Sequence, residues 1–184
     1  MVSGFFEKGW FLLFCGFTLF LWGCSGAGKG LPPLETVERV NLPRYIGTWY
    51  EIAAYPARFQ KGCVATEAEY SLRSDGLIQV VNRCRKERLD GPLQSVTGKA
   101  RVINPPANSR LEVSFFWPFW GDYWIIALDP DYQWAVVGHP SRKYLWILSR
   151  SRSLDDGIYR PLLEQLPAQG YDPARLRRTL QPGG

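Results

Sequence analysis

The chain has 184 residues, of which 46% are hydrophobic, 15% aromatic and 21% charged. This composition predicts one globular domain with a sizeable core and excludes disorder over most of the chain. The formal net charge is +5, but the basic clusters are short and separated along the sequence. They do not gather with aromatic residues on one continuous face, so no nucleic-acid partner is expected.

Residues 1–23 are interpreted as an export signal. An uncharged, aromatic-rich run extends from Gly9 to Gly23 and follows Lys8. The run is shorter than the about 20 apolar residues that a lasting transmembrane helix needs, and small residues follow it. A plain cleaved signal and an uncleaved N-terminal anchor are the alternatives to a lipoprotein signal.

The end of this run, Leu21-Trp-Gly-Cys24, resembles the lipobox of bacterial lipoproteins, although Trp22 stands where a small residue is usual. The resemblance implies that Cys24 becomes the acylated, palmitate-bearing first residue of the mature protein. Ser25 after it then implies sorting to the cell outer membrane, with the domain in the periplasm. Residues 24–40 contain a Gly- and Pro-rich stretch and are expected to form a flexible tether.

Residues 41–184 begin with alternating apolar and polar segments separated by turn residues. Ser74-Asp-Gly76 lies between two such segments and favours a tight hairpin, because Asp-Gly readily supplies positive φ angles. Short connections without helices predict an antiparallel up-and-down meander, and closing it into a β-barrel removes the two exposed edges. The expected strands are Thr48–Tyr55, Val64–Leu72, Leu77–Arg85, Gln94–Ile103, Arg110–Phe116, Asp122–Leu128, Tyr132–Gly138 and Tyr144–Ser149.

A helical pattern follows the eighth strand. Ser153-Leu-Asp-Asp156 resembles a capping box with Asp in place of Glu, and a helix is expected from about Leu154 to Gln165. Its apolar stripe should pack on the barrel wall. The tail around Arg175–Leu180 is expected to add one short strand. The residues of the stripe are Ile158, Leu162, Leu163 and Leu166.

Cys63 and Cys84 are the two cysteines of the exported part, and they fall at the far ends of one predicted hairpin. An even pair in an oxidising compartment favours a disulfide. Strict alternation would place the two side chains on different faces of the sheet unless a bulge intervenes. The spacing of Cys and His predicts no metal site, and His139 is interpreted as an incidental surface residue.

Eight meandering strands followed by one helix, opened by Gly47-Thr-Trp-Tyr50, resemble a lipocalin. Asp129-Pro-Asp-Tyr132 occupies the place of a second family motif, with Pro130 departing from it, and Leu145 to Arg150 carries the third. The resemblance extends from about Leu42 to the C-terminus. Within the family, the chain is similar to the bacterial outer-membrane lipoprotein lipocalins and their apolipoprotein D-like relatives.

Successive turns of an up-and-down barrel alternate between its two ends. The three motifs should therefore meet at one closed end, where Arg150 is expected to lie over the face of Trp49. We expect these residues to form a structural floor without a catalytic role. The floor residues are Gly47, Trp49, Asp131, Tyr132 and Arg150.

The opposite, open end is where function is expected. The lipocalin resemblance implies a cavity that binds fatty acids or lysophospholipids for storage or transport in the cell envelope, without a cofactor. There are two alternatives. One is an enzyme that uses the barrel cavity as a lipid substrate pocket, and the other is a structural envelope protein with a filled barrel. The oligomeric state stays open, a dimer included. The expected ligand-binding residues are Ala68, Tyr70, Ile78, Val80, Asn82, Val113, Phe115 and Trp146, with Trp117 in an aromatic rim at the mouth.

Overall fold

The computed structural model describes residues 30–183. The predicted export signal, the predicted lipid anchor Cys24 and the first part of the predicted tether lie outside the described residues. Across residues 30–183, no helix is both long enough and apolar enough to cross a membrane.

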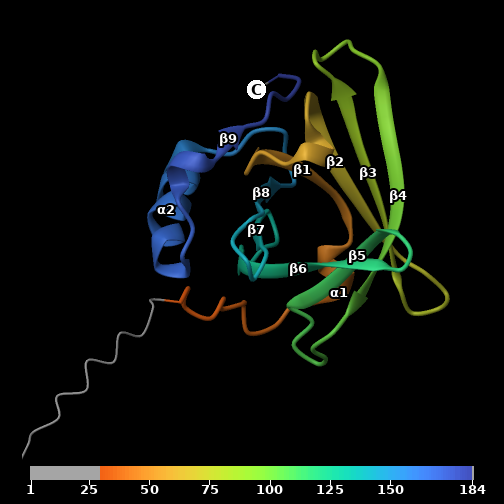
Figure 1. Ribbon diagram of the computed structural model, residues 1–184, viewed down its shortest axis with the longest axis vertical. Helices are drawn as coiled ribbons and strands as arrows, with labels where there is room; N and C mark the ends of the chain where they lie inside the picture. The colour runs from red at the N-terminus through yellow and green to blue at the C-terminus, as the bar shows by residue number, and fades with distance from the viewer. Residues whose placement is uncertain (1–29, 184) are drawn as a thin grey trace, which may run out of the picture. The chain divides into compact units, whose positions relative to one another are not determined.

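Eight antiparallel strands close into a barrel, which confirms the predicted fold (Figure 1). Each strand pairs with the next along the chain, and β1 pairs with both β8 and β2. The strands are β1 (Gly47–Ala54), β2 (Cys63–Leu72), β3 (Ile78–Lys86), β4 (Leu93–Val102), β5 (Arg110–Phe116), β6 (Phe119–Leu128), β7 (Trp134–Gly138) and β8 (Leu145–Ser149).

The seam between β1 and β2 is only partly closed by the two strands. Their pairing covers Gly47 to Tyr50, and beyond it the C-terminal tail lies along β1 as the two-residue strand β9 (Arg177–Arg178). The backbone carbonyl of Leu180 then accepts a hydrogen bond from Ala65 N on β2. The predicted extra strand is therefore present, and the tail completes the wall.

The segment before the barrel does not behave as a tether along its whole predicted length. Leu34 and Val40 are buried, and the backbone nitrogens of Val37 and Val40 donate to carbonyls of the barrel. Burial of these apolar side chains stabilises the contact. The predicted tether boundary at residue 40 is thus wrong at its C-terminal end, because residues 31–40 pack with the domain.

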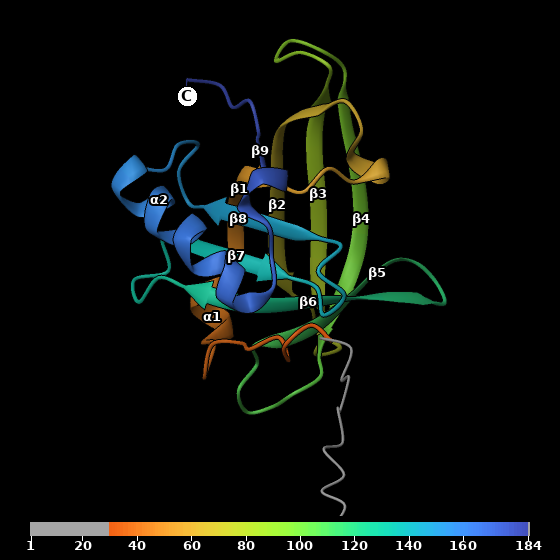
Figure 2. The ribbon, with the colours of Figure 1, turned by 60° about the vertical axis from the view of Figure 1, so that its left-hand side comes forward.

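The helix α2 (Asp156–Gln165) packs beside β7 and β8 (Figures 1 and 2). Its N-cap is Asp155, whose carboxylate accepts from Gly157 N, so the predicted cap at Ser153 is wrong. Tyr159 replaces Ile158 on the buried stripe. Two 3-10 turns, η2 (Leu166–Gln169) and η3 (Pro173–Arg175), carry the chain to the tail.

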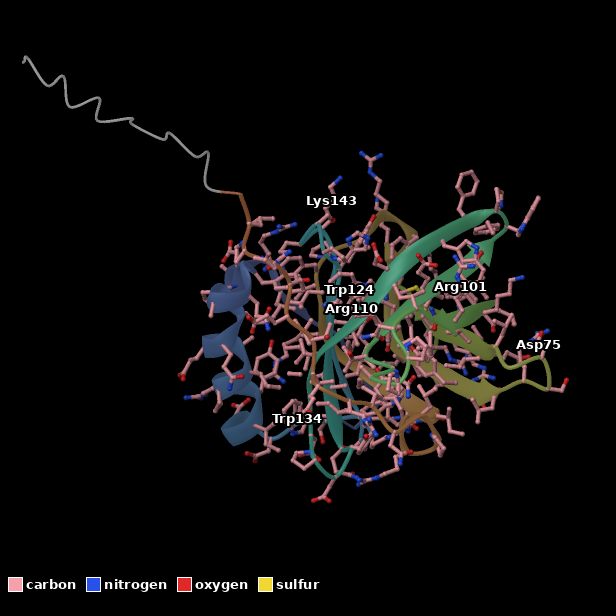
Figure 3. All side chains as sticks on the ribbon, turned by 90° about the horizontal axis from the view of Figure 1, so that it is seen from below. Asp75, Arg101, Arg110, Trp124, Trp134 and Lys143 are labelled. Carbon is pink, nitrogen blue, oxygen red and sulfur yellow. A yellow bond between two sulfur atoms is a disulfide. The ribbon has the colours of Figure 1, made fainter. Side chains whose placement is uncertain are left out.

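The hairpin of β5 and β6 departs from the expected boundaries. The structure starts β6 at Phe119, three residues before the predicted Asp122, because Phe119 pairs with Phe116 across a very short turn. At the other end of the hairpin, the Arg110 guanidinium lies 4.5 Å from the ring centroid of Trp124 (Figure 3). This stacked pair ties the two strands together on one face.

A disulfide joins Cys63 and Cys84, with the Cα atoms 5.5 Å apart. The register of β2 against β3 shifts between Val64 and Glu67, and Ala65 has a φ of 49°. This irregularity is a β-bulge. It brings to one face of the sheet two cysteines that strict alternation would have placed on opposite faces, so the disulfide can form.

The helix α1 (Leu42–Tyr45) lies at the closed end of the barrel, where the three sequence motifs meet. The Arg150 guanidinium carbon is 3.8 Å from the Trp49 ring centroid, and Trp49 is fully buried. Arg150 also donates to the carbonyls of Thr48 at 2.8 Å and Tyr132 at 3.3 Å. The Arg150 guanidinium, just after β8, therefore links β1 and the connection before β7 at the closed end.

The remaining floor residues lie around this contact. Gly47 has a φ of 97°, and a Cβ built on it would come within 3.3 Å of Arg150 Nη1. Tyr132 stacks under the Arg44 guanidinium at 4.3 Å, whereas the Asp131 carboxylate is exposed and 3.9 Å from Arg44 Nη2. Asp131 therefore belongs to the rim of the floor rather than to its packed centre.

Candidate functional site

The barrel encloses a cavity of about 800 Å³. This volume falls within the roughly 300–1,000 Å³ that is typical of small-molecule sites. A barrel whose core is filled by its own side chains would leave no such space, so the cavity argues against the filled structural protein. The predicted ligand-binding residues that line it are Ala68, Tyr70, Val80, Asn82, Val113, Phe115 and Trp146.

Ile78 and Trp117 are not part of the cavity lining. Ile78 is the first residue of β3 and is buried in the core at the closed end, below the cavity. Trp117 is 80% exposed at the turn of the β5–β6 hairpin. For Ile78, alternation gives the inward face of the strand but not the height at which the cavity ends. Trp117 is predicted at the mouth because of its loop, and the structure places that loop at the exposed hairpin turn.

The tip of the β5–β6 hairpin projects away from the other strands (Figure 2). β4 pairs with β5 only from Lys99 to Val102, so the first part of β4 has no partner on that side among the described residues. Phe116 and Phe119 are exposed beside Trp117. The predicted aromatic rim is therefore a protruding tip.

Three tyrosine hydroxyls meet above the floor. Tyr70 donates to the Tyr123 hydroxyl at 3.0 Å, and the Tyr45 and Tyr123 hydroxyls are 2.7 Å apart. Burial raises the pKa of Tyr70 to about 12 and also raises the pKa of Tyr45 and of Tyr123. The cluster is therefore neutral, and Tyr70 and Tyr123 give the lower cavity its hydroxyl groups.

A buried carboxyl faces the cavity higher in the wall. Glu51 Oε2 accepts from Gln60 Nε2 at 2.7 Å, and Oε1 accepts from the Thr179 hydroxyl at 2.5 Å. Gln60, in the 3-10 turn η1 (Arg58–Gln60), accepts in turn from Trp146 Nε1 at 3.1 Å. Burial is the main cause that raises the pKa of the Glu51 carboxyl, and these hydrogen bonds oppose it.

Two polar atoms of the wall are buried and make no hydrogen bond within residues 30–183. They are Thr66 Oγ1 on β2 and Asn82 Oδ1 on β3, and both residues line the cavity. Gln181 joins Thr66 to the Glu51 strand, because its side-chain nitrogen donates to both backbone carbonyls at 2.9 Å. Buried polar atoms without a partner are costly, so each is a candidate contact for a bound molecule.

Aromatic rings line the upper cavity beside these groups. Tyr144 stacks on Trp146 with ring centroids 5.9 Å apart, and Phe59 approaches Tyr144 at 5.7 Å. His139 contacts the other edge of Tyr144 at 5.6 Å. His139 therefore belongs to the cavity wall, and its interpretation as an incidental surface residue is wrong.

His139 also lies beside a serine and an aspartate, which bears on the enzyme alternative. Its Nδ1 is 2.9 Å from the Ser141 hydroxyl, and its Nε2 is 3.7 Å from Asp122 Oδ2. The Ser141 backbone N–H also donates to Nδ1, and the Asp122 distance exceeds that of a hydrogen bond. The arrangement is thus a local turn and lacks the aligned base of a catalytic triad.

The same environment sets the charge of the imidazole. Burial lowers the pKa of His139, while the Asp122 carboxylate partly opposes this shift.

Among the described residues, no group of three or more His, Cys, Asp or Glu side chains could hold a metal ion.

The cavity contains residues that pattern reasoning missed. Glu51 shares strand parity with Trp49, so alternation could have placed its carboxyl inside the barrel. Tyr123 lies within the predicted sixth strand, Asp122–Leu128, so the alternation of that strand could have placed its side chain inside the barrel. Gln60 and Phe59 lie in a connection, and no strand period places a loop residue in a cavity.

Comparison with known proteins gives consistent matches. Residues 40–181 match the lipocalin-like domain. Outer membrane lipoprotein Blc of Escherichia coli K12 is 41% identical over 155 residues, covering 83% of this chain and 86% of that protein. Temperature-induced lipocalin-1 of Arabidopsis thaliana is 41% identical over 157 residues, covering 80% and 83% respectively.

Solved structures agree in fold. Insecticyanin from the tobacco hornworm Manduca sexta superposes with a TM-score of 0.64 at 22% identity, covering 82% of this chain and 85% of that one. At this identity the likeness concerns the fold alone.

Proposed function

This chain belongs to the lipocalin family, and from that premise we propose that it binds a single-chain lipid, a fatty acid or a lysophospholipid, in the cavity of its barrel. The cavity of about 800 Å³ is the observation that carries the proposal. A barrel of eight strands is just wide enough to hold one small ligand.

The lining supports an amphiphile rather than a wholly apolar guest. The Val80, Val113 and Phe115 side chains offer apolar surface for an acyl chain. Polar groups gather elsewhere in the wall, around Glu51 and Gln60. A few placed polar groups in a largely apolar pocket are what orient a ligand.

We assign the cavity a carrier role and no catalytic one. The Ser141 hydroxyl and His139 are the nearest approach to a nucleophile and base, and His139 Nδ1 already accepts a backbone N–H. Turnover of a lysophospholipid by the purified protein would contradict this assignment.

Tryptophan fluorescence tests the proposal directly. Delipidated protein titrated with a fatty acid carrying a quencher should show saturable quenching, since Trp146 lines the cavity. Trp146→Phe should remove a large share of the quenching, and Trp117→Phe, on the exposed tip, should leave it in place. Absence of saturation, or equal effects of the two variants, would contradict binding in the cavity.

For the location, we propose attachment to the outer membrane through an acylated Cys24, with the barrel in the periplasm. The support is the lipobox-like Leu21-Trp-Gly-Cys24 and the similarity to outer membrane lipoproteins. Cys24→Ala should release the protein from the membrane fraction, measured by fractionation and immunoblot. An unchanged membrane fraction would instead indicate that the hydrophobic run stays as the anchor.

A further inference from the structure

We propose that the upper cavity binds an N–H-bearing ammonium group at the polar end of the ligand, with the Glu51 carboxylate as its counter-ion. The inference rests on the proposed function, because it names the headgroup of a chain bound in the same cavity. The chemistry is that of a primary ammonium on an alkyl chain, whether as a simple alkylamine or as the ethanolamine of a lysophospholipid.

The balance of hydrogen-bond donors and acceptors in the upper cavity favours a headgroup that donates. The Trp146 N–H and one of the two Gln60 amide hydrogens are already used, because Trp146 donates to Gln60 and Gln60 donates to Glu51. Within residues 30–183, the cavity-lining atoms without a partner are Thr66 Oγ1 and Asn82 Oδ1, and the amide oxygen can only accept. The Thr66 hydroxyl can pair with a donor or an acceptor, but Asn82 Oδ1 needs a headgroup that donates, and a carboxylate supplies no donor.

The charge of the cavity lining favours a cationic headgroup. Glu51 has no cationic side chain within ion-pairing distance among residues 30–183. The cation Arg83 also lines the cavity, but it pairs with Glu67 at 3.5 Å and Glu69 at 2.8 Å. Asp122 adds a further carboxylate at the wall. The uncompensated charge of the lining is therefore negative, which opposes an anionic headgroup.

The Glu51 carboxylate can accept further hydrogen bonds. Each Glu51 oxygen accepts one hydrogen bond, and a carboxylate offers about four acceptor positions. Two positions are left for a ligand. Burial raises the pKa of Glu51 when no cation is present, and an ammonium at hydrogen-bond distance would favour the ionised form.

The strand register places the acceptors around one space. Trp49, Ala68 and Asn82 are aligned across β1, β2 and β3. Glu51 is the next inward position of β1 beyond Trp49, and Thr66 is bridged to it through Gln181. The aromatic wall of Trp146 and its neighbours faces the same cavity and adds attraction for a cation.

Calorimetric titration of the delipidated barrel with three dodecyl amphiphiles tests the inference at neutral pH. Dodecylamine should bind about tenfold more tightly than dodecanoate, because its ammonium can pair with the Glu51 carboxylate, whereas a carboxylate headgroup is repelled by it and supplies no donor. Dodecyltrimethylammonium, which is cationic but has no N–H, should also bind less tightly than dodecylamine. Glu51→Gln should remove the preference for the amine. Glu112→Gln, which removes one carboxylate outside the cavity, should keep it.

The outcomes separate the inference from the proposed function. If dodecanoate binds as tightly as dodecylamine, or if Glu51→Gln keeps the preference, the ammonium site is refuted while lipid binding stands. If no dodecyl chain binds, the proposed function fails as well. Lysophosphatidylethanolamine and lysophosphatidylcholine then distinguish the sources. A Glu51-dependent preference for the ethanolamine lipid supports a lysophospholipid, and a preference seen only with dodecylamine supports a free alkylamine.

Discussion

Replacement of Arg150 by Met should remove the main cross-link of the barrel floor. The guanidinium lies 3.8 Å from the Trp49 ring and donates to five backbone carbonyls. Met keeps an apolar chain over the ring but provides no donor.

The expected loss follows from these contacts. The cation–π contact is worth about 0.5–2 kcal/mol, and a typical hydrogen bond contributes about 0.5–1.5 kcal/mol net. The floor is partly accessible, so water replaces some of the bonds to the carbonyls. We therefore expect a loss of about 3 kcal/mol in the free energy of unfolding, which corresponds to roughly 6–12 °C in Tm for a domain of this size.

Urea unfolding followed by circular dichroism measures this loss, with Arg152→Met as the matched control. Arg152 lies 5.1 Å from the Tyr50 ring centroid and is exposed, so its replacement should cost less than about 1 kcal/mol. A loss for Arg150→Met no larger than that of the control would refute the view that Arg150 holds the floor.

Three further changes test other parts of the account. Burial raises the pKa of Glu51 in the folded state, so the protonated carboxyl should stabilise the fold below its ordinary pKa of 4.5, and this stabilisation should be lost as pH rises through the raised pKa. Glu51→Gln should flatten this decline in the free energy of unfolding. Parallel pH profiles of urea unfolding for the two proteins would contradict it. Reduction of the Cys63–Cys84 disulfide, which spans 21 residues, should lower the free energy of unfolding by about 3 kcal/mol, because the unfolded chain regains loop entropy. The shift in urea midpoint relative to the oxidised protein measures this loss, and an unchanged midpoint would count against it. Gly98→Ala places a Cβ 2.6 Å from Ser114 O and 2.7 Å from Phe115 Cδ1, so it should destabilise the protein by about 1–3 kcal/mol through the β4–β5 contact. An unchanged Tm in a thermal melt would disprove the close approach.

The barrel could be predicted from the sequence because alternation, turn residues and three ordered motifs all agree. Tyr70, Val80 and Phe115 line the cavity for the same reason, since the parity of a strand gives its inward face. The height of the cavity floor depends on how side chains such as Ile78 fill the closed end. That packing is a property of the whole barrel and leaves no local signal.

The polar part of the site could not be predicted in the same way. Gln60 comes from a loop and Thr179 from the tail, and both reach Glu51 only in the folded barrel. The sequence places these residues 9 and 128 positions from Glu51. No period of a strand or a helix links such positions, so only the closed barrel reveals the network.

The measurement that tests the central claim most directly is calorimetric titration of the delipidated protein with a lysophospholipid at several temperatures. The account predicts one ligand per barrel and a negative heat-capacity change, because an acyl chain is removed from water. Ala68→Trp, which places a large side chain in the cavity, should abolish this binding while the barrel stays folded by circular dichroism. Unchanged binding to the folded variant would contradict a ligand site inside the barrel.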